Sequence, residues 1–191
     1  DQFRVFREAG YRVKADVLNA ADYGVPQQRR RIFIVGMRED LGADYTFPAP
    51  THGLGRAAPH VTIAQAIGDL PAWPEGEFYA RDFHWYYLSR NRRQDWDEVS
   101  KTIVANPRHM PLHPVSPHMV KHAHNDWRFA TDAPARRFSW REAARLQGFA
   151  HDFVFPDTPA GSLDMRYKVA GNAVPPPLFE AVVRALPPVW D

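Results

Sequence analysis

The sequence predicts an α/β protein in which regular strands and helices at both ends of the chain flank a long irregular region. Alternating apolar residues near the start indicate strands at about 11–17 and 31–36. Residues 37 to about 130 are rich in Pro, Gly and aromatic side chains and show little helical periodicity. Helix signals return after Ser139. We therefore expect both ends to form one α/β layer, with an irregular α+β region between them.

The first strands are expected to belong to a larger sheet. A short helix that ends at Gly10 should lead directly into the strand at 11–17, and a loop at 19–26 should follow. Residues 31–36 place apolar side chains on both faces, as in an interior strand. Because two strands do not make a stable sheet alone, we expect more strands from elsewhere. The abrupt start suggests a piece of a longer protein or of a split one.

Regular elements further along the chain are predicted mainly from the residues that would cap them. A short helix is expected at 62–70, where Thr62 can act as the N-cap, and a strand at 102–105. Ser139 and Glu142 have the spacing of a capping box, which predicts a helix that Gly148 ends. Prolines enclose a last helix at about 177–186.

Composition limits the classes of protein to which the chain can belong. The 191 residues are 45% hydrophobic, which permits a packed core and argues against disorder. The chain has no cysteine, so it contains no disulfide, cysteine-ligated zinc or thiolate nucleophile of its own. No apolar run is long enough to span a bilayer, and the start lacks the pattern of a signal peptide. We expect a soluble, intracellular protein with no membrane partner.

The basic residues are mostly arginines. Only four of the 24 Lys and Arg residues are lysines. The planar fork of donors on Arg suits phosphates and guanine edges, so this bias is compatible with nucleic-acid binding. A GC-rich genome would produce the same bias, and composition alone does not separate the two explanations.

Three motifs in order resemble those of the DNA cytosine-C5 methyltransferases. They are residues 24–31 (GVPQQRRR), 141–149 (REAARLQGF) and 171–176 (GNAVPP), which correspond to the eighth, ninth and tenth motifs of that family. Residues 47–52 (FPAPTH) and 61–71 are also typical of its variable region. The resemblance covers nearly the whole chain. One departure is Ala150, where the family usually has Pro.

The resemblance implies an enzyme that transfers a methyl group from S-adenosylmethionine to C5 of a cytosine flipped out of duplex DNA. In that family a Cys thiolate adds to the base, a Glu engages N3, and a Phe-Gly-Gly loop carries the cofactor. None of these three motifs is present here. Family order places them before Asp1, so we expect an upstream catalytic segment or subunit as a partner and no activity from this chain alone.

The predicted catalytic residues are Gln27, Arg29 and Arg31, which form the Gln-x-Arg-x-Arg signature. By resemblance, Arg31 binds the O2 edge of the flipped cytosine, Arg29 holds neighbouring groups and Gln27 orients the loop. Arg suits these roles because it stays charged and presents fixed donors. The alternative is that the successive arginines form a solvated strand edge.

The resemblance also assigns cofactor contacts to Asn172, Ala173 and Val174. The same residues are compatible with a Gly-Asn turn before a helix that begins with proline, and both descriptions can hold together.

The variable region is expected to select the DNA sequence. We predict DNA contacts from the arginines of its charged segments, although such segments are more often merely solvated. Asn91 or Gln94 could pair with adenine. The predicted DNA-binding residues are Arg90, Arg92, Arg93 and Arg108.

A metal site is a weaker hypothesis. His118, His122 and His124 fall near helical i, i+4 spacing and, with His113, could bind zinc. Pro114 and Pro117 would disturb such a helix, and no suitable Cys or Glu motif accompanies the histidines, so we predict no metal.

The predicted organisation has three parts. Residues 1–38 form the last strands of an incomplete Rossmann-like methyltransferase lobe, 39–165 an irregular α+β target recognition domain, and 166–191 the tenth motif and a closing helix. The expected function is that of the C-terminal part of a bacterial, cytoplasmic restriction-modification methyltransferase. The alternatives are a natural subunit of a split methyltransferase and a DNA-binding module that has lost catalysis.

Overall fold

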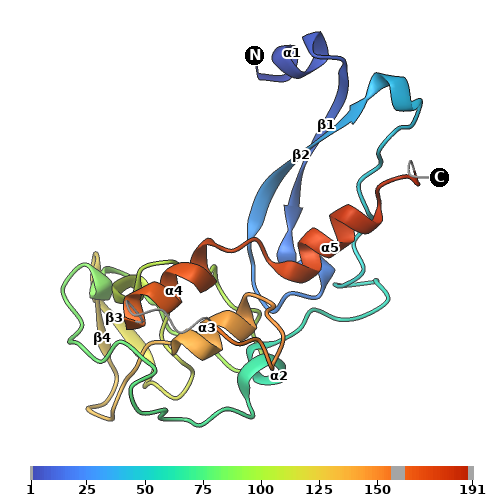
Figure 1. Ribbon diagram of the computed structural model, residues 1–191. Coiled ribbons are helices and arrows are strands. Elements are labelled where there is room, and N and C mark those ends of the chain that lie inside the picture. Colours follow the sequence, from blue (N-terminus) through green and yellow to red (C-terminus); the bar gives the residue numbers. More distant parts are fainter. Residues whose placement is uncertain (1, 156–161, 189–191) are drawn as a thin grey trace.

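The computed structural model describes residues 2–155 and 162–188. It has two parts, a long twisted hairpin accompanied by helices α1 and α5, and a compact part that contains α2, α3, α4 and a second hairpin (Figure 1). The chain begins in the first part, passes through the second, and returns to the first through α5 (Figure 1). On this return path α5 packs against the hairpin, so both ends of the chain lie in the same part of the structure.

The long hairpin pairs β1 (Tyr11–Asn19) with β2 (Arg30–Arg38) in antiparallel register. The predicted strands are thus confirmed, and each is longer than expected. Helix α1 (Gln2–Glu8) precedes β1, as predicted, and the 3₁₀ helix η1 (Ala20–Tyr23) begins the connection between the strands.

One face of the hairpin packs against helix α5 (Pro176–Arg184). Phe33, Val35 and Met37 lie on this face and share a cluster with Leu178 and Val182 of the helix. Alternate residues of a strand point to opposite faces.

That other face is apolar and exposed. Ile32 is 63% exposed and Ile34 is 44% exposed, and Val17, which pairs with Ile32, is exposed as well. We expected residues 31–36 to be covered on both faces. Within the described residues β2 pairs only with β1, so the prediction of an interior strand is not met there.

The compact part is built around three short helices. These are α2 (Ile63–Ile67), α3 (Trp140–Leu146) and α4 (Leu163–Asn172), whose apolar side chains share one cluster with Ile103 and Phe138. The helices at Thr62 and Ser139 are confirmed, and both begin with the capping box that their sequence contains. Remaining short elements are the 3₁₀ helices η2 (Glu39–Leu41), η3 (Tyr87–Ser89) and η4 (Pro107–His109).

Three features of the compact part differ from expectation. Residues 102–105 form no strand, because the backbone of Ile103 binds the side chains of Gln27 and Arg29 instead of another strand. Helix α4 was not predicted. The second hairpin, β3 (Met119–Ala123) and β4 (Asp126–Phe129), carries His122, so the suggested helical histidine spacing is wrong.

A buried ion pair lies beneath the start of α3. Arg136 donates from Nη1 and Nη2 to the two carboxylate oxygens of Glu142, at 2.8 and 2.7 Å, and both side chains are almost completely buried. Glu142 Oε2 also accepts the backbone N–H of Ser139, which completes the capping box. His113 Nε2 lies 3.4 Å from Glu142 Oε1, and its Nδ1 accepts the N–H of Val115.

Burial keeps His113 neutral. Desolvation, assisted by the positive charge of Arg136, lowers the pKa of His113 from 6.5 to about 3. Between these values the unfolded chain binds a proton that the folded chain does not, so stability falls as the pH drops below about 6.5. This one group should contribute a slope of about 1.4 kcal/mol per pH unit.

We therefore expect His113→Asn to flatten the pH dependence of unfolding. The amide oxygen of Asn can still accept the N–H of Val115, but the side chain cannot take up a proton. Urea unfolding of wild type and variant at pH 7 and pH 5 measures the difference between their slopes. Equal slopes would contradict the assignment of a neutral, desolvated His113.

Candidate functional site

Gln27 is the centre of a buried contact between distant segments. Its side chain is fully buried, and its Nε2 donates to Leu146 O at 3.2 Å and to Gln147 Oε1 at 2.6 Å. Its Oε1 accepts the N–H of Ile103 at 2.7 Å. One amide therefore joins the loop before β2, the end of α3 and the segment at 103.

Arg29 extends this contact to the last part of the chain. Its Nη1 donates to Ile103 O at 3.0 Å, and its Nη2 donates to Gly171 O at 2.9 Å. Burial, with a smaller contribution from the nearby charge of Arg31, lowers the pKa of Arg29 to about 10. The guanidinium therefore remains charged at neutral pH, and its hydrogen bonds are charge-assisted.

Close backbone packing completes this buried contact. A Cβ placed on Gly171 would lie 2.5 Å from Val104 O, so only glycine lets α4 approach the segment at 104–105 this closely. Gln147 Nε2 donates to Ala173 O, which holds the chain just after α4. The three sequence motifs thus meet in one place. We call Gln27, Arg29, Gln147 and Gly171 the motif junction.

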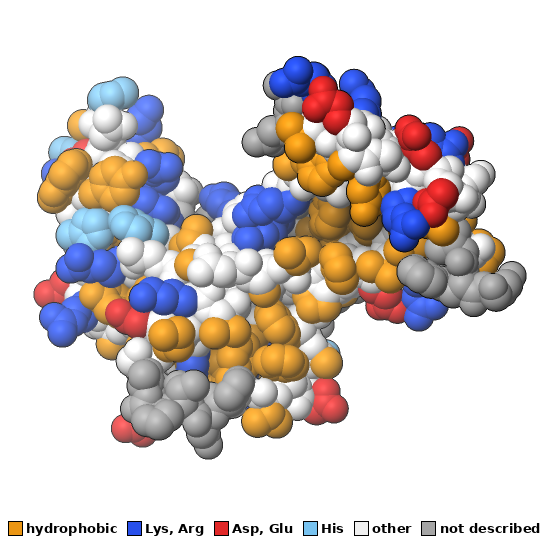
Figure 2. Space-filling model, turned by 45° about the horizontal axis from the view of Figure 1, so that its top comes forward, with side chains coloured by type: hydrophobic (Ala, Val, Ile, Leu, Met, Phe, Trp, Pro, Cys, Tyr) orange, Lys and Arg blue, Asp and Glu red, His pale blue; other side chains and the backbone are white. Residues whose placement is uncertain are grey.

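Arg31 differs from its neighbour Arg29 because it is exposed. Its Nη1 donates to the backbone carbonyl of Arg30 at 2.7 Å. Figure 2 shows the surface hollowed between two lobes, with Lys and Arg side chains gathered at the bottom of the hollow and His side chains on one of the lobes. Arg31 is therefore accessible, whereas Gln27 and Arg29 act inside the protein.

The predicted cofactor residues lie at the end of α4 and just after it. Asn172 is the last residue of α4 and is exposed, Ala173 is partly buried, and Val174 is exposed. Asn172 lines a pocket of about 680 Å³ together with residues of the 105–108 segment and of α4. The side chain of Asn172 has no hydrogen-bond partner within the described residues and is available to a ligand.

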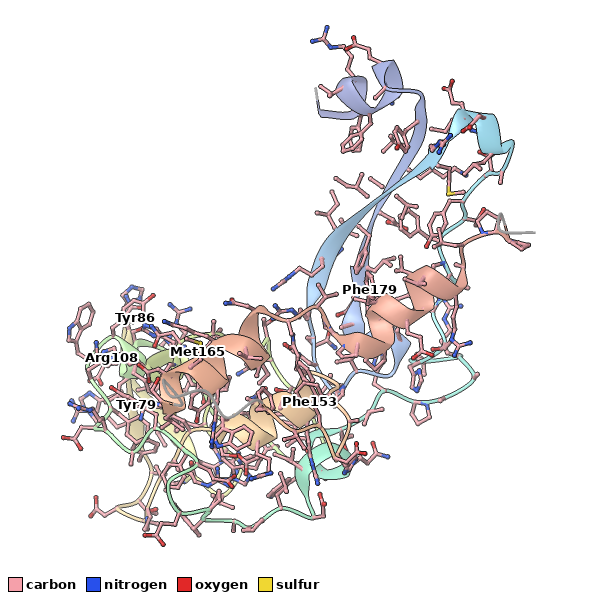
Figure 3. The ribbon with its side chains drawn as sticks, in the orientation of Figure 1. Tyr79, Tyr86, Arg108, Phe153, Met165 and Phe179 are labelled. Atoms are coloured by element: carbon pink, nitrogen blue, oxygen red, sulfur yellow. The ribbon has the colours of Figure 1, made fainter. Side chains whose placement is uncertain are left out.

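Two of the four predicted DNA-binding arginines are exposed. Arg90 lies over the ring of Tyr86, 5.7 Å from its centroid, and Arg108 lines the same pocket as Asn172. Figure 3 places Tyr86 and Arg108 in the compact part, near the first turns of α4. Rings of His84, Trp85 and His109 surround Tyr86.

The other two arginines are engaged in the fold. Arg92 Nε donates to Tyr87 O at 3.0 Å, and the Arg92 guanidinium lies 4.7 Å from the centroid of the Tyr87 ring. Arg93, whose side chain is only 10% exposed, binds Ser116 O and pairs with Asp95. These contacts use hydrogen-bond donors of Arg92 and Arg93 that would otherwise be available to DNA.

The suggestion that Gln94 could pair with adenine is wrong. Its side chain is 1% exposed, and its Oε1 accepts the N–H of Lys101. A buried amide cannot reach a base edge in a groove.

Sequence reasoning missed several residues of the site. Gln147 lies within the ninth motif, but nothing local indicates that it reaches Gln27 and Ala173. Arg81 and Lys168, which also line the 680 Å³ pocket, are isolated basic residues with no signal of their own. A metal centre has no candidate in the part of the chain that the structure describes, because no group of three or more His, Asp or Glu side chains lies together. Among the described helices, none is long and apolar enough to cross a membrane.

Comparison with known proteins gives matches over almost the whole chain. The model of the C-5 cytosine-specific DNA methylase family matches residues 2–187. The chain is 41% identical over 199 residues to the Type II methyltransferase M.MthTI of Methanothermobacter thermautotrophicus, covering 95% of this chain and 58% of the relative. It is 42% identical over 185 residues to M.BsuRI of Bacillus subtilis, covering 93% and 42%. The chain thus spans about half the length of these relatives.

Solved structures agree at the level of the fold. A putative DNA modification methyltransferase encoded within an E. coli prophage has a TM-score of 0.65 at 18% identity, covering 96% of this chain and 63% of the other. The Entamoeba histolytica methyltransferase EhMeth has a TM-score of 0.62 at 13% identity, covering 95% and 55%. Together with the family match and the three motifs that meet at the motif junction, these similarities establish that the chain belongs to the C-5 cytosine-specific DNA methylase family.

Proposed function

We propose that this chain is the DNA-recognising part of a DNA cytosine-C5 methyltransferase and that it supplies portions of both the active site and the cofactor site. The motif junction is the observation that carries the proposal. Arg29 binds Ile103 O in the proposed recognition region and Gly171 O beside the proposed cofactor contact. The exposed Arg31 follows two residues later on the same strand. The regions proposed for DNA recognition, for contact with the flipped base and for contact with the cofactor are thus all connected through the motif junction.

Arg31 is suited to bind the flipped cytosine. Negative charge develops on the ring when a nucleophile adds to it, and a guanidinium that stays charged stabilises that charge at the O2 edge. Because the pKa of Arg29 remains near 10, a second fixed positive charge stands behind Arg31. The role of both arginines in this proposal is electrostatic and positional.

The residues present fit S-adenosylmethionine at one side of its site. Asn172 presents an amide without a partner in the described residues, and it is one of the residues that line the 680 Å³ pocket. When bound, the cofactor supplies the methyl group. Within this chain, Asn172 would bind it, and Ala173 and Val174 would pack against it.

The nucleophile must come from outside these 191 residues, because the chain has no cysteine. We propose that an upstream catalytic segment or a separate subunit supplies it. The apolar face of the hairpin, with Val17, Ile32 and Ile34, offers that partner a surface to cover. Phe179 and Val183 of α5 are exposed as well. In this proposal the hairpin and α5 complete a Rossmann-like lobe, and residues 39–165 form the target recognition domain.

Methyl transfer from labelled S-adenosylmethionine to mixed-sequence duplex DNA tests the proposal. We expect no incorporation with the chain alone and clear incorporation after addition of the catalytic segment of the same gene. Robust turnover by the pure chain would overturn the assignment of the nucleophile to a partner. DNA binding without transfer in either case would instead favour a module that only binds.

Arg31→Gln should lower the rate of methyl transfer in the reconstituted enzyme. Loss of one preorganised donor to a developing anion typically costs on the order of 100-fold in kcat. The fold should be unaffected because the Arg31 side chain is exposed. The matched control is Arg30→Gln, the same change at the adjacent exposed residue. Equal kcat values for the two variants would contradict a catalytic role for Arg31.

A further inference from the structure

Arg137 is a buried arginine that lies outside the motif junction. Its side chain is 1% exposed. Its Nη1 donates to the carbonyl oxygens of Tyr79 and Arg81, at 3.2 and 2.8 Å, and its Nη2 donates to that of Asp82 at 3.3 Å. One guanidinium therefore holds the backbone of the segment at 79–82, which contains no helix or strand.

Three aromatic rings enclose the same guanidinium. The Cζ atom of Arg137 lies 4.3 Å from the centroid of the Phe83 ring, 4.6 Å from that of Tyr87 and 5.2 Å from that of Tyr79. A guanidinium at such a distance is attracted to the negative face of an aromatic ring. Arg137 therefore fixes the positions of side chains as well as of backbone.

Tyr87 connects Arg137 to a further segment. It belongs to η3, and its hydroxyl donates to Met110 O at 2.8 Å. Met110 is the C-cap of η4. Arg137 is thus linked to three segments of the surface, at 79–82, 86–90 and 107–110.

Each of these segments carries exposed side chains of the kinds that contact DNA. Arg81, Tyr86, Arg90 and Arg108 are all exposed. Figure 3 shows Tyr79, Tyr86 and Arg108 at the same end of the compact part. Arg90 and Arg108 are the two arginines predicted to bind DNA that remain accessible. One buried residue therefore holds, from inside, the segments that present these side chains.

Stability alone does not account for a buried charge at this position. Within the described residues Arg137 forms no ion pair, whereas its neighbour Arg136 pairs with Glu142. Burial lowers the pKa of Arg137, because the charged form loses its contact with water. Apolar side chains of similar volume often stabilise a core as well as buried charges do. What an apolar side chain cannot do is bind several carbonyl groups in one fixed plane.

We propose that Arg137 is a positioning residue for DNA sequence recognition, and that it holds the three segments in the arrangement in which their exposed side chains meet one duplex. The inference rests on the proposed function and deepens it, because it assigns sequence discrimination to a buried residue that does not touch DNA. Hydrogen bonds to base edges require side chains at fixed positions in a groove. Movement of one segment therefore weakens discrimination between bases.

The test variant is Arg137→Lys. Lysine keeps the positive charge, but its single nitrogen cannot reproduce the planar fork that binds three carbonyl groups and lies against three rings. We expect the hydrogen-bonded amides of Tyr87 and Met110 to exchange with deuterium about tenfold faster, the effect of losing one charge-assisted hydrogen bond on local opening. The amide of Ile103, which donates to Gln27 in the motif junction, should keep its wild-type rate and so separates local opening from global unfolding.

Sequence recognition is measured by letting the 191-residue chain enrich sequences from a library of random duplexes. We expect the wild-type chain to enrich one sequence pattern and Arg137→Lys to discriminate about tenfold less, the factor that corresponds to one good base contact. The matched control is Arg141→Lys, because Arg141 pairs with Glu77 at 2.9 Å and both side chains are partly exposed. This control should keep the wild-type exchange rates and discrimination.

Tyr87→Phe tests the same connection without altering a charge. It removes only the hydroxyl that donates to Met110 O. Exchange should therefore become faster at Met110 and discrimination should fall, and this result is obtained even if Arg137→Lys does not fold. Thermal unfolding checks that each variant is folded.

Unchanged exchange at Tyr87 and Met110 in the folded variants would overturn the proposal. Faster exchange with wild-type discrimination would also overturn it, because Arg137 would then serve only the fold. The same holds if the wild-type chain enriches no sequence. Methyl transfer by the reconstituted enzyme is assayed separately, and its absence beside reduced discrimination in Arg137→Lys would defeat the proposed function and support the role of Arg137.

Discussion

Replacement of Glu142 by glutamine should lower the free energy of unfolding by about 3–5 kcal/mol, since removal of one member of a buried ion pair leaves the other charge uncompensated. Arg136 makes two charge-assisted hydrogen bonds to Glu142 and has no exposure to water. Glutamine has nearly the same shape and can still accept the N–H of Ser139, so the capping box survives. The measured loss of unfolding free energy therefore reflects removal of the Glu142 charge and not loss of the helix cap.

Glu77→Gln is the matched control for this change. Glu77 pairs with Arg141 at 2.9 Å, but both side chains are partly exposed, and such pairs contribute about 0–1 kcal/mol. Chemical denaturation of the two variants beside wild type measures both effects. If Glu142→Gln lowered the free energy of unfolding by less than about 1 kcal/mol, water or a rearrangement would have to compensate the charge of Arg136. That result would contradict an ion pair that is fully shielded from water.

Gly171→Ala should destabilise the chain by more than the about 1–3 kcal/mol that overpacking typically costs. The added methyl group would overlap the backbone of Val104 and Ala105, and backbone cannot rotate away as a side chain can. Helix α4 would have to move off the 104–105 segment. That movement would lengthen the hydrogen bond from Arg29 to Gly171 O and displace Asn172. We expect thermal unfolding to show the loss of stability and the reconstituted enzyme to bind S-adenosylmethionine more weakly.

Gly36→Ala provides the comparison for this variant. Gly36 lies in β2, and a Cβ there would approach the Tyr11 ring only to an ordinary distance of 3.4 Å. Alanine should be tolerated at this exposed site or slightly stabilise it, because it restricts the unfolded chain more than glycine does. Similar melting temperatures for the two variants would show that the close approach at Gly171 has little energetic importance.

Local signals in the sequence were sufficient for the elements whose stability is local. The helix at Ser139 begins with a capping box that is complete within four residues, and the helix at Thr62 does the same with Gln65. The hairpin strands alternate strongly enough to be recognised without knowledge of their partners. By contrast, α4 has a weak apolar periodicity. It is held by Tyr167 and Gly171, whose partners lie far away in sequence.

Long-range hydrogen bonds explain the failure at residues 102–105. The β-branched residues there predict a strand, but the backbone groups of Ile103 are satisfied by Gln27 and Arg29, which are more than 70 residues away. The same limit applies to the candidate site. The motifs could be identified from the sequence. The sequence did not show, however, that Arg29 is buried and holds the backbone whereas Arg31 is exposed. Nor did it show the use of Arg92 and Arg93 within the fold, because that use depends on Tyr87 and Ser116 being nearby.

The hydrogen bond from Arg29 to Gly171 also has a consequence for chain entropy. The two residues are 142 positions apart, and joining the ends of a flexible loop of that length costs about 4 kcal/mol. One charge-assisted hydrogen bond contributes less than this, so the contact cannot persist in an otherwise unfolded chain. It forms only when the intervening residues have already contracted into their core. A chain whose intervening residues are unfolded therefore presents separate motifs without a site.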